Sequence, residues 1–221
     1  MAKLSNGFAG EIVRPDDPGY DAARAVWNSM IDRRPALIVR PTGTDDVVAA
    51  LRFAREQELV IAIRCGGHSI PGFSTCDDGI VIDLSRMHGA DVDPERRTAQ
   101  VRGGSLLAEL DDAAQAHRLV CPVGVVSHTG VAGLTLGGGM GRLQCKLGLT
   151  IDSLLAVELV TADGQLVGPL DRVGDHAVGH LPLQRVQQEL ERRHDPEVRT
   201  GSSHAPEELR ILVLACPHDS A

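Results

Sequence analysis

Aromatic side chains are scarce in this chain of 221 residues: they account for 2% of it, and none follows Phe73. Sites that hold flat organic molecules are usually lined by aromatic and apolar side chains, so the second half of the chain has few means of gripping such a substrate. The chain also lacks an apolar run of the roughly 18 residues that a membrane-spanning helix needs. We therefore expect no membrane partner, and the sequence does not reveal the substrate.

Cysteine and positive charge are also limited. The five cysteines are odd in number and scattered, which does not favour a disulfide framework. Residues 1–10 lack the apolar core of a signal peptide, so we expect reduced thiols and a cytoplasmic location. The 22 basic side chains are outnumbered by 30 acidic ones, which gives a net charge of −8. An acidic surface argues against nucleic acid as a partner.

The sequence pattern divides the chain into three parts. Residues 1–32 are expected to be a lead-in segment, with a short helix over residues 20–32 whose apolar face carries Ala23, Val26, Trp27 and Met30. Residues 33–168 form the main domain. Residues 169–221 hold five of the nine histidines and show one clear pattern, a short helix over residues 183–193. We place a boundary at Gly168 and expect a tail that is disordered or the product of a frame shift.

Strand and helix patterns alternate in the main domain. Buried strands are predicted at residues 36–39, 60–63 and 80–84, and further strands at residues 98–102, 157–161 and 165–167. Helices are predicted to begin at Thr44 and Ser105, with these two residues as N-caps. Asp163-Gly164 predicts a hairpin between the last two strands. This order indicates an α+β fold with α/β-like character.

A glycine loop directly follows the predicted strand at residues 60–63. It consists of Arg64-Cys65-Gly66-Gly67-His68-Ser69. Two adjacent glycines let the backbone approach a ligand closely and present its N–H groups, an arrangement that suits a diphosphate. His68 supplies a nucleophilic ring nitrogen. The alternative is a tight turn with a hydrogen-bonded histidine, because a short motif is weak evidence by itself.

A second glycine-rich stretch covers residues 124–141, where seven of eighteen residues are glycine. Valine, alanine and leucine stand between the glycines, which indicates ordered backbone packed against a flat or phosphate-bearing group rather than a linker. A set of tight turns is the alternative. A dinucleotide-binding fingerprint would need a glycine where Arg142 or Gln144 stands, and a P-loop would need one at Cys145, before Lys146. Neither motif is present.

Four segments together resemble the FAD-linked oxidases of the berberine bridge enzyme type. They are Arg40-Pro41-Thr42 with the following Asp45-Asp46-Val47, residues 64–69 with 74–79 and 82–85, residues 125–141, and residues 148–154 with 161–164. The resemblance covers about 135 residues and implies a PCMH-type FAD-binding fold, with a small βαβ subdomain followed by a larger mixed-sheet subdomain. It stops near Gly168, whereas members of the family continue into a substrate domain.

The resemblance also implies roles for individual residues. Arg64, Cys65, Gly66, Gly67, His68 and Ser69 would wrap the diphosphate, and the His68 imidazole would bond covalently to the 8α position of the flavin. Thr129, Gly130 and Gly133 would line the ribityl and ring side, and Val160 would lie near the adenine. Some members attach the flavin through a second bond to cysteine. Val126 occupies that position here, so attachment through His68 alone is expected.

Two functions stay open at this point. The chain is an FAD-binding oxidoreductase that moves a hydride from an alcohol, sugar or amine-type carbon to flavin N5, with reoxidation by oxygen, or it is a truncated, non-catalytic flavin-binding remnant. No catalytic base can be named, because Tyr20 is the only tyrosine and precedes the domain. A zinc site at Cys65, His68, Cys76 and His88 is a weaker alternative, because the spacing matches no common zinc motif. We expect no metal.

Overall fold

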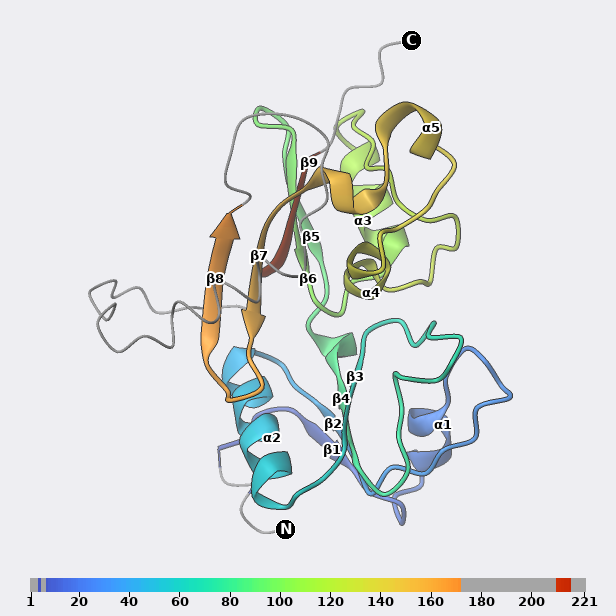
Figure 1. Ribbon diagram of the computed structural model, residues 1–221, viewed down its shortest axis with the longest axis vertical. Helices are drawn as coiled ribbons and strands as arrows, with labels where there is room; N and C mark the ends of the chain where they lie inside the picture. The colour runs from blue at the N-terminus through green and yellow to red at the C-terminus, as the bar shows by residue number, and fades with distance from the viewer. Residues whose placement is uncertain (1–3, 5–6, 172–209, 216–221) are drawn as a thin grey trace, which may run out of the picture.

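The computed structural model describes residue 4, residues 7–171 and residues 210–215. For residues 169–171 and 210–215 it describes the backbone only. Two modules follow one another along the long axis of the molecule (Figure 1). The first contains the described residues up to about residue 86. The second contains residues 90–171 and 210–215.

The first module is built on a four-stranded sheet in the order β1-β2-β4-β3. Strand β1 (Glu11–Val13) is antiparallel to β2 (Leu37–Arg40), whereas β2, β4 (Ile80–Asp83) and β3 (Ile61–Arg64) run parallel. Helix α2 (Thr44–Glu56) connects β2 to β3, because parallel strands need a crossover connection. The predicted βαβ subdomain is confirmed.

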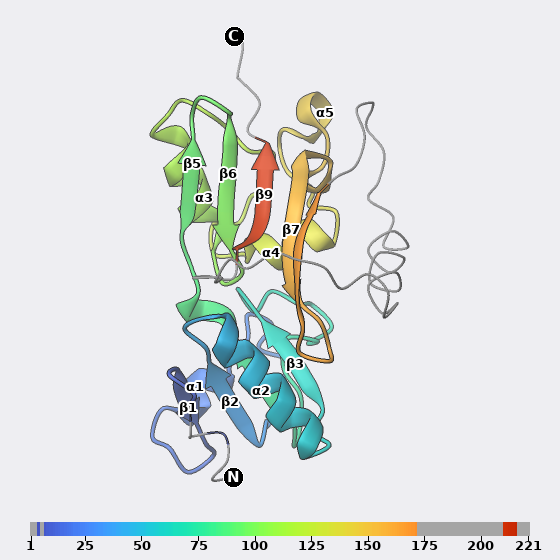
Figure 2. The same ribbon diagram turned by 90° about the vertical axis from the view of Figure 1, so that its left-hand side faces the viewer.

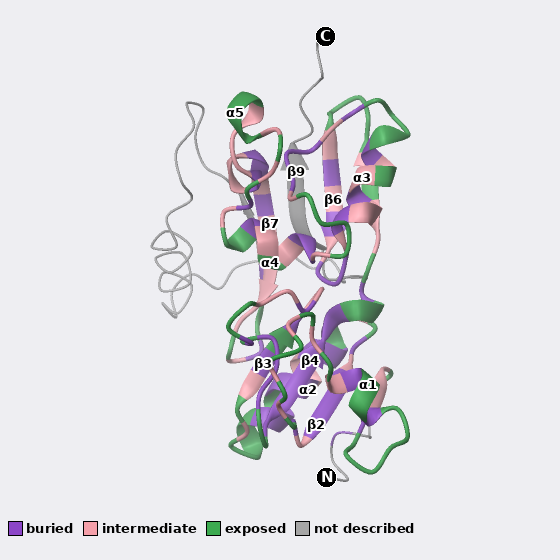
Figure 3. Ribbon diagram, turned by 90° about the vertical axis from the view of Figure 1, so that its right-hand side faces the viewer, coloured by how far each residue is buried: buried purple, intermediate pink, exposed green. Residues whose placement is uncertain are grey.

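Both faces of this sheet are covered, because side chains alternate between the two faces along each strand. Leu37 and Val39 pack with α2, whereas Ile38 packs with Tyr20 of helix α1 (Tyr20–Arg24) on the opposite face. The two helices flank the sheet in Figures 1 and 2. The central strands β2 and β4 are therefore buried nearly throughout (Figure 3).

The second module is a five-stranded antiparallel sheet in the order β5-β6-β9-β7-β8. A short 3-10 helix, η1 (Leu84–Arg86), leads into it. Its elements in chain order are β5 (Ala90–Asp93), β6 (Thr98–Arg102), α3 (Leu107–Gln115), α4 (Val131–Leu136), α5 (Gln144–Leu147), the 3-10 helix η2 (Thr150–Ser153), β7 (Leu154–Val160), β8 (Leu166–Asp171) and β9 (Arg210–Ala215). Helices α3 and α4 contribute to the core that lies against this sheet. The mixed helix and strand content predicted from the sequence is confirmed.

The chain beyond Gly168 contributes backbone to this sheet. Strand β8 continues past that glycine to Asp171, and β9 lies between β6 and β7 (Figure 2). The helix predicted over residues 183–193 lies outside the described residues. The segment before residue 33, expected as a lead-in, supplies β1 and α1 to the first module.

The N-terminal helix is shorter than predicted. Helix α1 ends at Arg24, and Ala25 has extended backbone angles. The chain leaves the helix because the Trp27 N–H donates a hydrogen bond to the Gly67 carbonyl, 3.2 Å away. Ala23 is buried as expected, but Trp27 and Met30 are exposed, so the predicted apolar face over residues 20–32 is wrong.

Both predicted N-caps are wrong. Gly43, not Thr44, occupies the N-cap position of α2. The Asp46 carboxylate accepts two hydrogen bonds at this turn, from the backbone N–H and the hydroxyl of Thr42. The Ser105 hydroxyl instead contacts the backbone of Gly89. The Ser105 hydroxyl is thus engaged by backbone across the module, whereas the Thr44 hydroxyl is buried without a hydrogen-bond partner among the described residues.

The strand predicted as buried at residues 60–63 is half-exposed. Strand β3 lies at the edge of its sheet. Ile63 within it and Val60 just before it are exposed. Continuous apolar sequence predicts burial on both faces only for a central strand. The Asp163-Gly164 hairpin is confirmed, with Gly164 at φ +79° in the turn between β7 and β8.

Candidate functional site

The two glycine-rich segments lie against each other, backbone to backbone. A Cβ atom added to Gly66 would lie 2.4 Å from the Gly130 nitrogen, and one added to Gly130 would lie 2.4 Å from the Cys65 Sγ atom. Atoms at such distances would overlap, so neither position has room for a side chain. The structure therefore joins the two segments that the sequence singled out separately.

The loop after β3 presents unpaired backbone N–H groups. Gly67 has φ +68°, which turns the chain sharply. Among the described residues, the N–H groups of Gly67, His68 and Ser69 have no hydrogen-bond acceptor. Three successive free donors in a glycine turn are suited to bind an anionic group such as a diphosphate.

A cleft of about 620 Å³ opens beside this loop, between the two modules. Its volume is in the range of small-molecule and cofactor sites. Residues from both modules line it: Trp27, Cys65, Gly66, His68, Ser85, His88, Gly104, Leu106, Glu109 and His128. Three of the ten are histidines, whose ring nitrogens can donate or accept hydrogen bonds.

His68 lies on the cleft wall between two other rings. The Trp27 ring stacks on it with a centroid distance of 5.1 Å and an interplanar angle of 19°. His128 approaches from the side of the second glycine-rich stretch, with its Nδ1 atom 2.6 Å from the His68 Nε2 atom. The Thr129 Oγ1 atom is 3.5 Å from the other ring nitrogen, Nδ1. The histidine is thus held in a defined orientation.

This setting favours the neutral form of His68. Burial lowers the pKa of His68 below its ordinary value, and the nearby charge of a protonated His128 lowers it further. A neutral imidazole has one ring nitrogen with a free lone pair. His68 is therefore available as a nucleophile at neutral pH.

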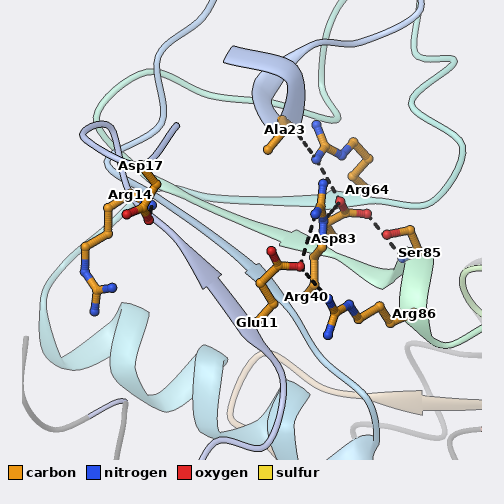
Figure 4. Close-up of polar contacts among 9 residues, drawn as sticks. All are labelled: Glu11, Arg14, Asp17, Ala23, Arg40, Arg64, Asp83, Ser85 and Arg86. Carbon is orange, nitrogen blue, oxygen red and sulfur yellow. Dashed lines mark hydrogen bonds and ion pairs between the residues drawn. The ribbon is translucent and has the colours of Figure 1, made fainter. Parts of the chain in front are cut away.

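The Arg64 side chain does not line the cleft. Its guanidinium is buried against Asp83, with Nη2 at 2.8 Å from Oδ2, and donates to the Ala23 carbonyl at 2.6 Å (Figure 4). Ala23 lies in the last turn of α1, where unpaired carbonyl groups attract positive charge. The side chain thus links α1 to β4. The guanidinium therefore does not face the cleft, and the expected part of Arg64 in wrapping the diphosphate stays a prediction.

The Cys65 side chain lines the cleft but is a poor nucleophile. Burial raises the pKa of its thiol to about 11. The sulfur lies 3.4 Å from the Ser105 carbonyl oxygen, to which the thiol donates. A thiol that is protonated at neutral pH is a small packing group here.

The cleft contains residues that the sequence did not identify. The His88 Nδ1 atom lies 2.6 Å from the Glu109 Oε1 atom, and both side chains face the cleft. Trp27 was expected on a helix face but stacks on His68. No spacing in the sequence connects these residues, because they come from separate loops and helices; Trp27 in a chain poor in aromatics was the one available signal.

The other predicted site residues are spread around the cleft. Ser69 caps the turn that follows the loop, since its hydroxyl accepts the Phe73 N–H at 3.0 Å. Gly133 is exposed on α4, and a Cβ there would meet nothing within 4 Å. Val160 packs against the core beneath α2 and is not among the residues that line the cleft.

Among the described residues, no three histidine, cysteine or acidic side chains come together as a metal site. The four residues considered for zinc do not form such a group. In the same part of the chain, no helix is both long and apolar enough to cross a membrane.

Comparison with known proteins identifies the cofactor. Residues 35–168 match the model of the FAD binding domain family. An uncharacterized FAD-linked oxidoreductase of Bacillus subtilis, YgaK, is 40% identical over 156 residues, which cover 71% of this chain and 35% of the relative. (R)-6-hydroxynicotine oxidase of Paenarthrobacter nicotinovorans is 37% identical over 158 residues, which cover 72% of this chain and 34% of the relative.

Comparison with solved structures finds the same kind of protein as the sequence comparison. The 6-hydroxy-D-nicotine oxidase of Arthrobacter nicotinovorans superposes with a TM-score of 0.72 at 37% identity, over 74% of this chain and 36% of that one. The glucooligosaccharide oxidase of Acremonium strictum gives a TM-score of 0.70 at 30% identity, over 75% and 35% of the two chains. The chain spans about a third of the length of these relatives. With its two glycine-rich segments joined at one cleft, this chain belongs to the FAD binding domain family, among the FAD-linked oxidoreductases.

Proposed function

We propose that the cleft beside His68 holds the flavin of FAD, and that the His68 imidazole bonds covalently to the flavin 8α carbon. The observation that carries this proposal is the position of His68, which faces the cleft between Trp27 and His128. The free N–H groups of residues 67–69 are the proposed contacts of the diphosphate. Thr129, Gly130 and Gly133 would follow the ribityl chain and ring, and Val160 the adenine.

The covalent step can be balanced with dioxygen as the oxidant. One hydrogen of the 8α methyl group and the imidazole N–H hydrogen are removed, and a carbon–nitrogen bond forms. The two electrons released pass through the flavin to dioxygen, which becomes hydrogen peroxide. The solved glucooligosaccharide oxidase carries a 6-S-cysteinyl, 8 alpha-N1-histidyl FAD. Because Val126 stands where we place the second attachment, this chain would form the histidyl bond alone.

We further propose that this chain is the cofactor-holding part of an oxidoreductase, with FAD accepting a hydride from a substrate carbon. The relatives' chemistry supports a small organic substrate, but the chain matches about a third of their length. The alternative is a module that holds flavin without turnover. Both are expected to act in the cytoplasm, with no nucleic acid or membrane as a partner.

Mass spectrometry tests the attachment. The purified full chain is precipitated with acid and digested, and the peptide that contains His68 is examined for the added mass of FAD. We expect the flavin in wild type and its absence in His68→Ala, with unchanged attachment in His117→Gln, a change at an exposed histidine outside the cleft. Flavin released by acid from wild type would contradict the covalent bond. Turnover with a panel of alcohols, sugars and amines then distinguishes the enzyme from the flavin-holding module.

A further inference from the structure

The contact between His68 and His128 requires a shared proton. Two ring nitrogens 2.6 Å apart cannot both direct lone pairs at each other, so one must donate to the other. His128 lies in an exposed loop segment and contributes no buried side chain to either core. The contact therefore does not follow from a packing role of His128.

The two nitrogens of His68 have different surroundings. Nε2 is occupied by the short contact with His128, whereas the nearest polar group to Nδ1 is the Thr129 hydroxyl at 3.5 Å. The stacked Trp27 ring covers one face of the imidazole, which opposes a ring flip that would exchange the nitrogens. Nδ1, whose contact with the Thr129 hydroxyl is the longer of the two, is the nitrogen more available to react.

We propose that His128 is a positioning residue that prepares His68 for bonding to the flavin. This inference rests on the proposed covalent attachment. The His128 Nδ1 atom accepts the Nε2 proton of His68, which fixes the tautomer whose lone pair lies on Nδ1. The new bond then forms at the His68 Nδ1 atom. As it forms, the Nε2 proton passes to His128, so that His68 ends as a neutral, singly substituted imidazole.

The electrostatics of the cleft agree with this direction of proton transfer. Burial and the charge of a protonated His128 lower the pKa of His68, so the His68 ring releases the Nε2 proton readily once the new bond forms at Nδ1. The exposed His128 ring is the group in contact with that nitrogen. The other titratable groups on the wall are Cys65, which stays protonated, and the His88–Glu109 pair, which is engaged internally. Among the described residues, the hydrogen-bond and ring contacts of the His68 side chain are with Trp27, His128 and Thr129, not with these three.

The test follows attachment over time. The full chain is produced without flavin, FAD is added, and acid-stable flavin is measured together with the position of substitution on the histidine by NMR of the flavin peptide. We expect substitution at Nδ1 in wild type, and attachment at least about 100-fold slower in His128→Ala, the low end of a general base contribution. In that variant we expect product at both nitrogens. His117→Gln is the matched control and should attach at the wild-type rate.

The conservative variant His128→Asn separates positioning from fold. Its amide oxygen can accept the Nε2 hydrogen bond but cannot take the proton, so it should keep substitution at Nδ1 while attachment stays slow. Added imidazole should speed attachment in His128→Ala, which a purely structural role would not explain. Non-covalent FAD affinity and circular dichroism confirm that each variant folds.

Four outcomes would overturn one or both proposals. Attachment of His128→Ala at the wild-type rate, or substitution of wild type at Nε2, would overturn the role of His128 and leave the His68 attachment standing. Wild type that binds FAD without attaching it, or flavin still attached in His68→Ala, would overturn the proposed attachment and this inference together.

Discussion

Gly66 and Gly130 touch through their backbones, and a Cβ atom at Gly66 would lie 2.4 Å from the Gly130 nitrogen and 2.8 Å from the His128 carbonyl oxygen. The obstacle is backbone, which cannot move aside as a flexible side chain can. The contact brings the loop after β3 to the stretch before α4. The geometry of the candidate site depends on this contact.

Substitution of Gly66 by alanine should therefore lower the free energy of unfolding. We expect a loss of about 2 kcal/mol or more, toward the upper end for overpacked positions, measured by urea denaturation. Gly133→Ala is the control, because a Cβ there meets nothing within 4 Å and alanine favours the helix by up to about 1 kcal/mol. Equal stabilities of the two variants would contradict the close contact.

The buried pair of Arg64 and Asp83 gives a second prediction. Asp83→Asn leaves the Arg64 guanidinium buried without a countercharge, since both side chains are about 5% exposed (6% and 5%). Loss of one partner of a buried pair costs about 3–5 kcal/mol, which chemical denaturation at pH 7 can measure. The matched control is Glu11→Gln, whose half-exposed carboxylate pairs with Arg40 and Arg86 and should cost at most about 1 kcal/mol.

The same pair predicts how stability responds to acid. Burial alone would raise the pKa of Asp83, but the charge and hydrogen bonds of Arg64, with hydrogen bonds from Arg40 and the Ser85 N–H, lower it. A carboxyl group with a lowered pKa in the folded state contributes stability above its ordinary pKa of about 3.9, and loses it as pH falls through the lowered value. Asp83→Asn should lack this contribution, so its stability deficit should shrink as the pH falls below about 4.

Cysteine reactivity should separate Cys65 from Cys145. A pKa of about 11 leaves about one Cys65 thiol in a thousand ionised at pH 8, and the thiolate is the reactive form. Cys145 is exposed on α5. Iodoacetamide followed by peptide mass spectrometry should label Cys145 well before Cys65, and both should react alike in denaturant. Early labelling of Cys65 in the folded protein would be the opposite result.

The titration of His68 gives a further prediction. Its pKa, followed by NMR in the protein without flavin, should lie below the ordinary value of about 6.5, because of burial and of the charge of His128. His128→Asn removes the second cause and should raise the value part of the way.

The lowered pKa of His68 determines how the free energy of unfolding changes with pH. As pH falls below about 6.5, the unfolded chain takes up a proton at this histidine before the folded chain does. The contribution of His68 to stability is thus present above that pH and lost as pH falls through the lowered pKa. A pKa of His68 that lies above 6.5, or that does not move in His128→Asn, would contradict this account.

Much of the fold was predictable because local sequence patterns determine many of its strands and turns. The apolar strands at residues 37–40 and 80–83 follow from their runs of branched side chains, and the turn at Gly164 follows from its Asp-Gly dipeptide. Two of the errors have one cause in common. Trp27 and Ser105 each have a local preference for helix or cap that contacts elsewhere in the structure overrode, with the backbone of Gly67 and of Gly89.

The sequence by itself determined which segments matter: two glycine-rich stretches, a histidine at the end of one of them, and the strands that carry them. Only the tertiary structure decided how they act together. His68 and His128 are 60 positions apart, and Arg64 and Asp83 are 19 apart. Glycine and strand patterns record what the local backbone must do. A proton shared between His68 and His128 depends on how the two modules pack, and the buried ion pair depends on the pairing of β3 with β4 within the first module.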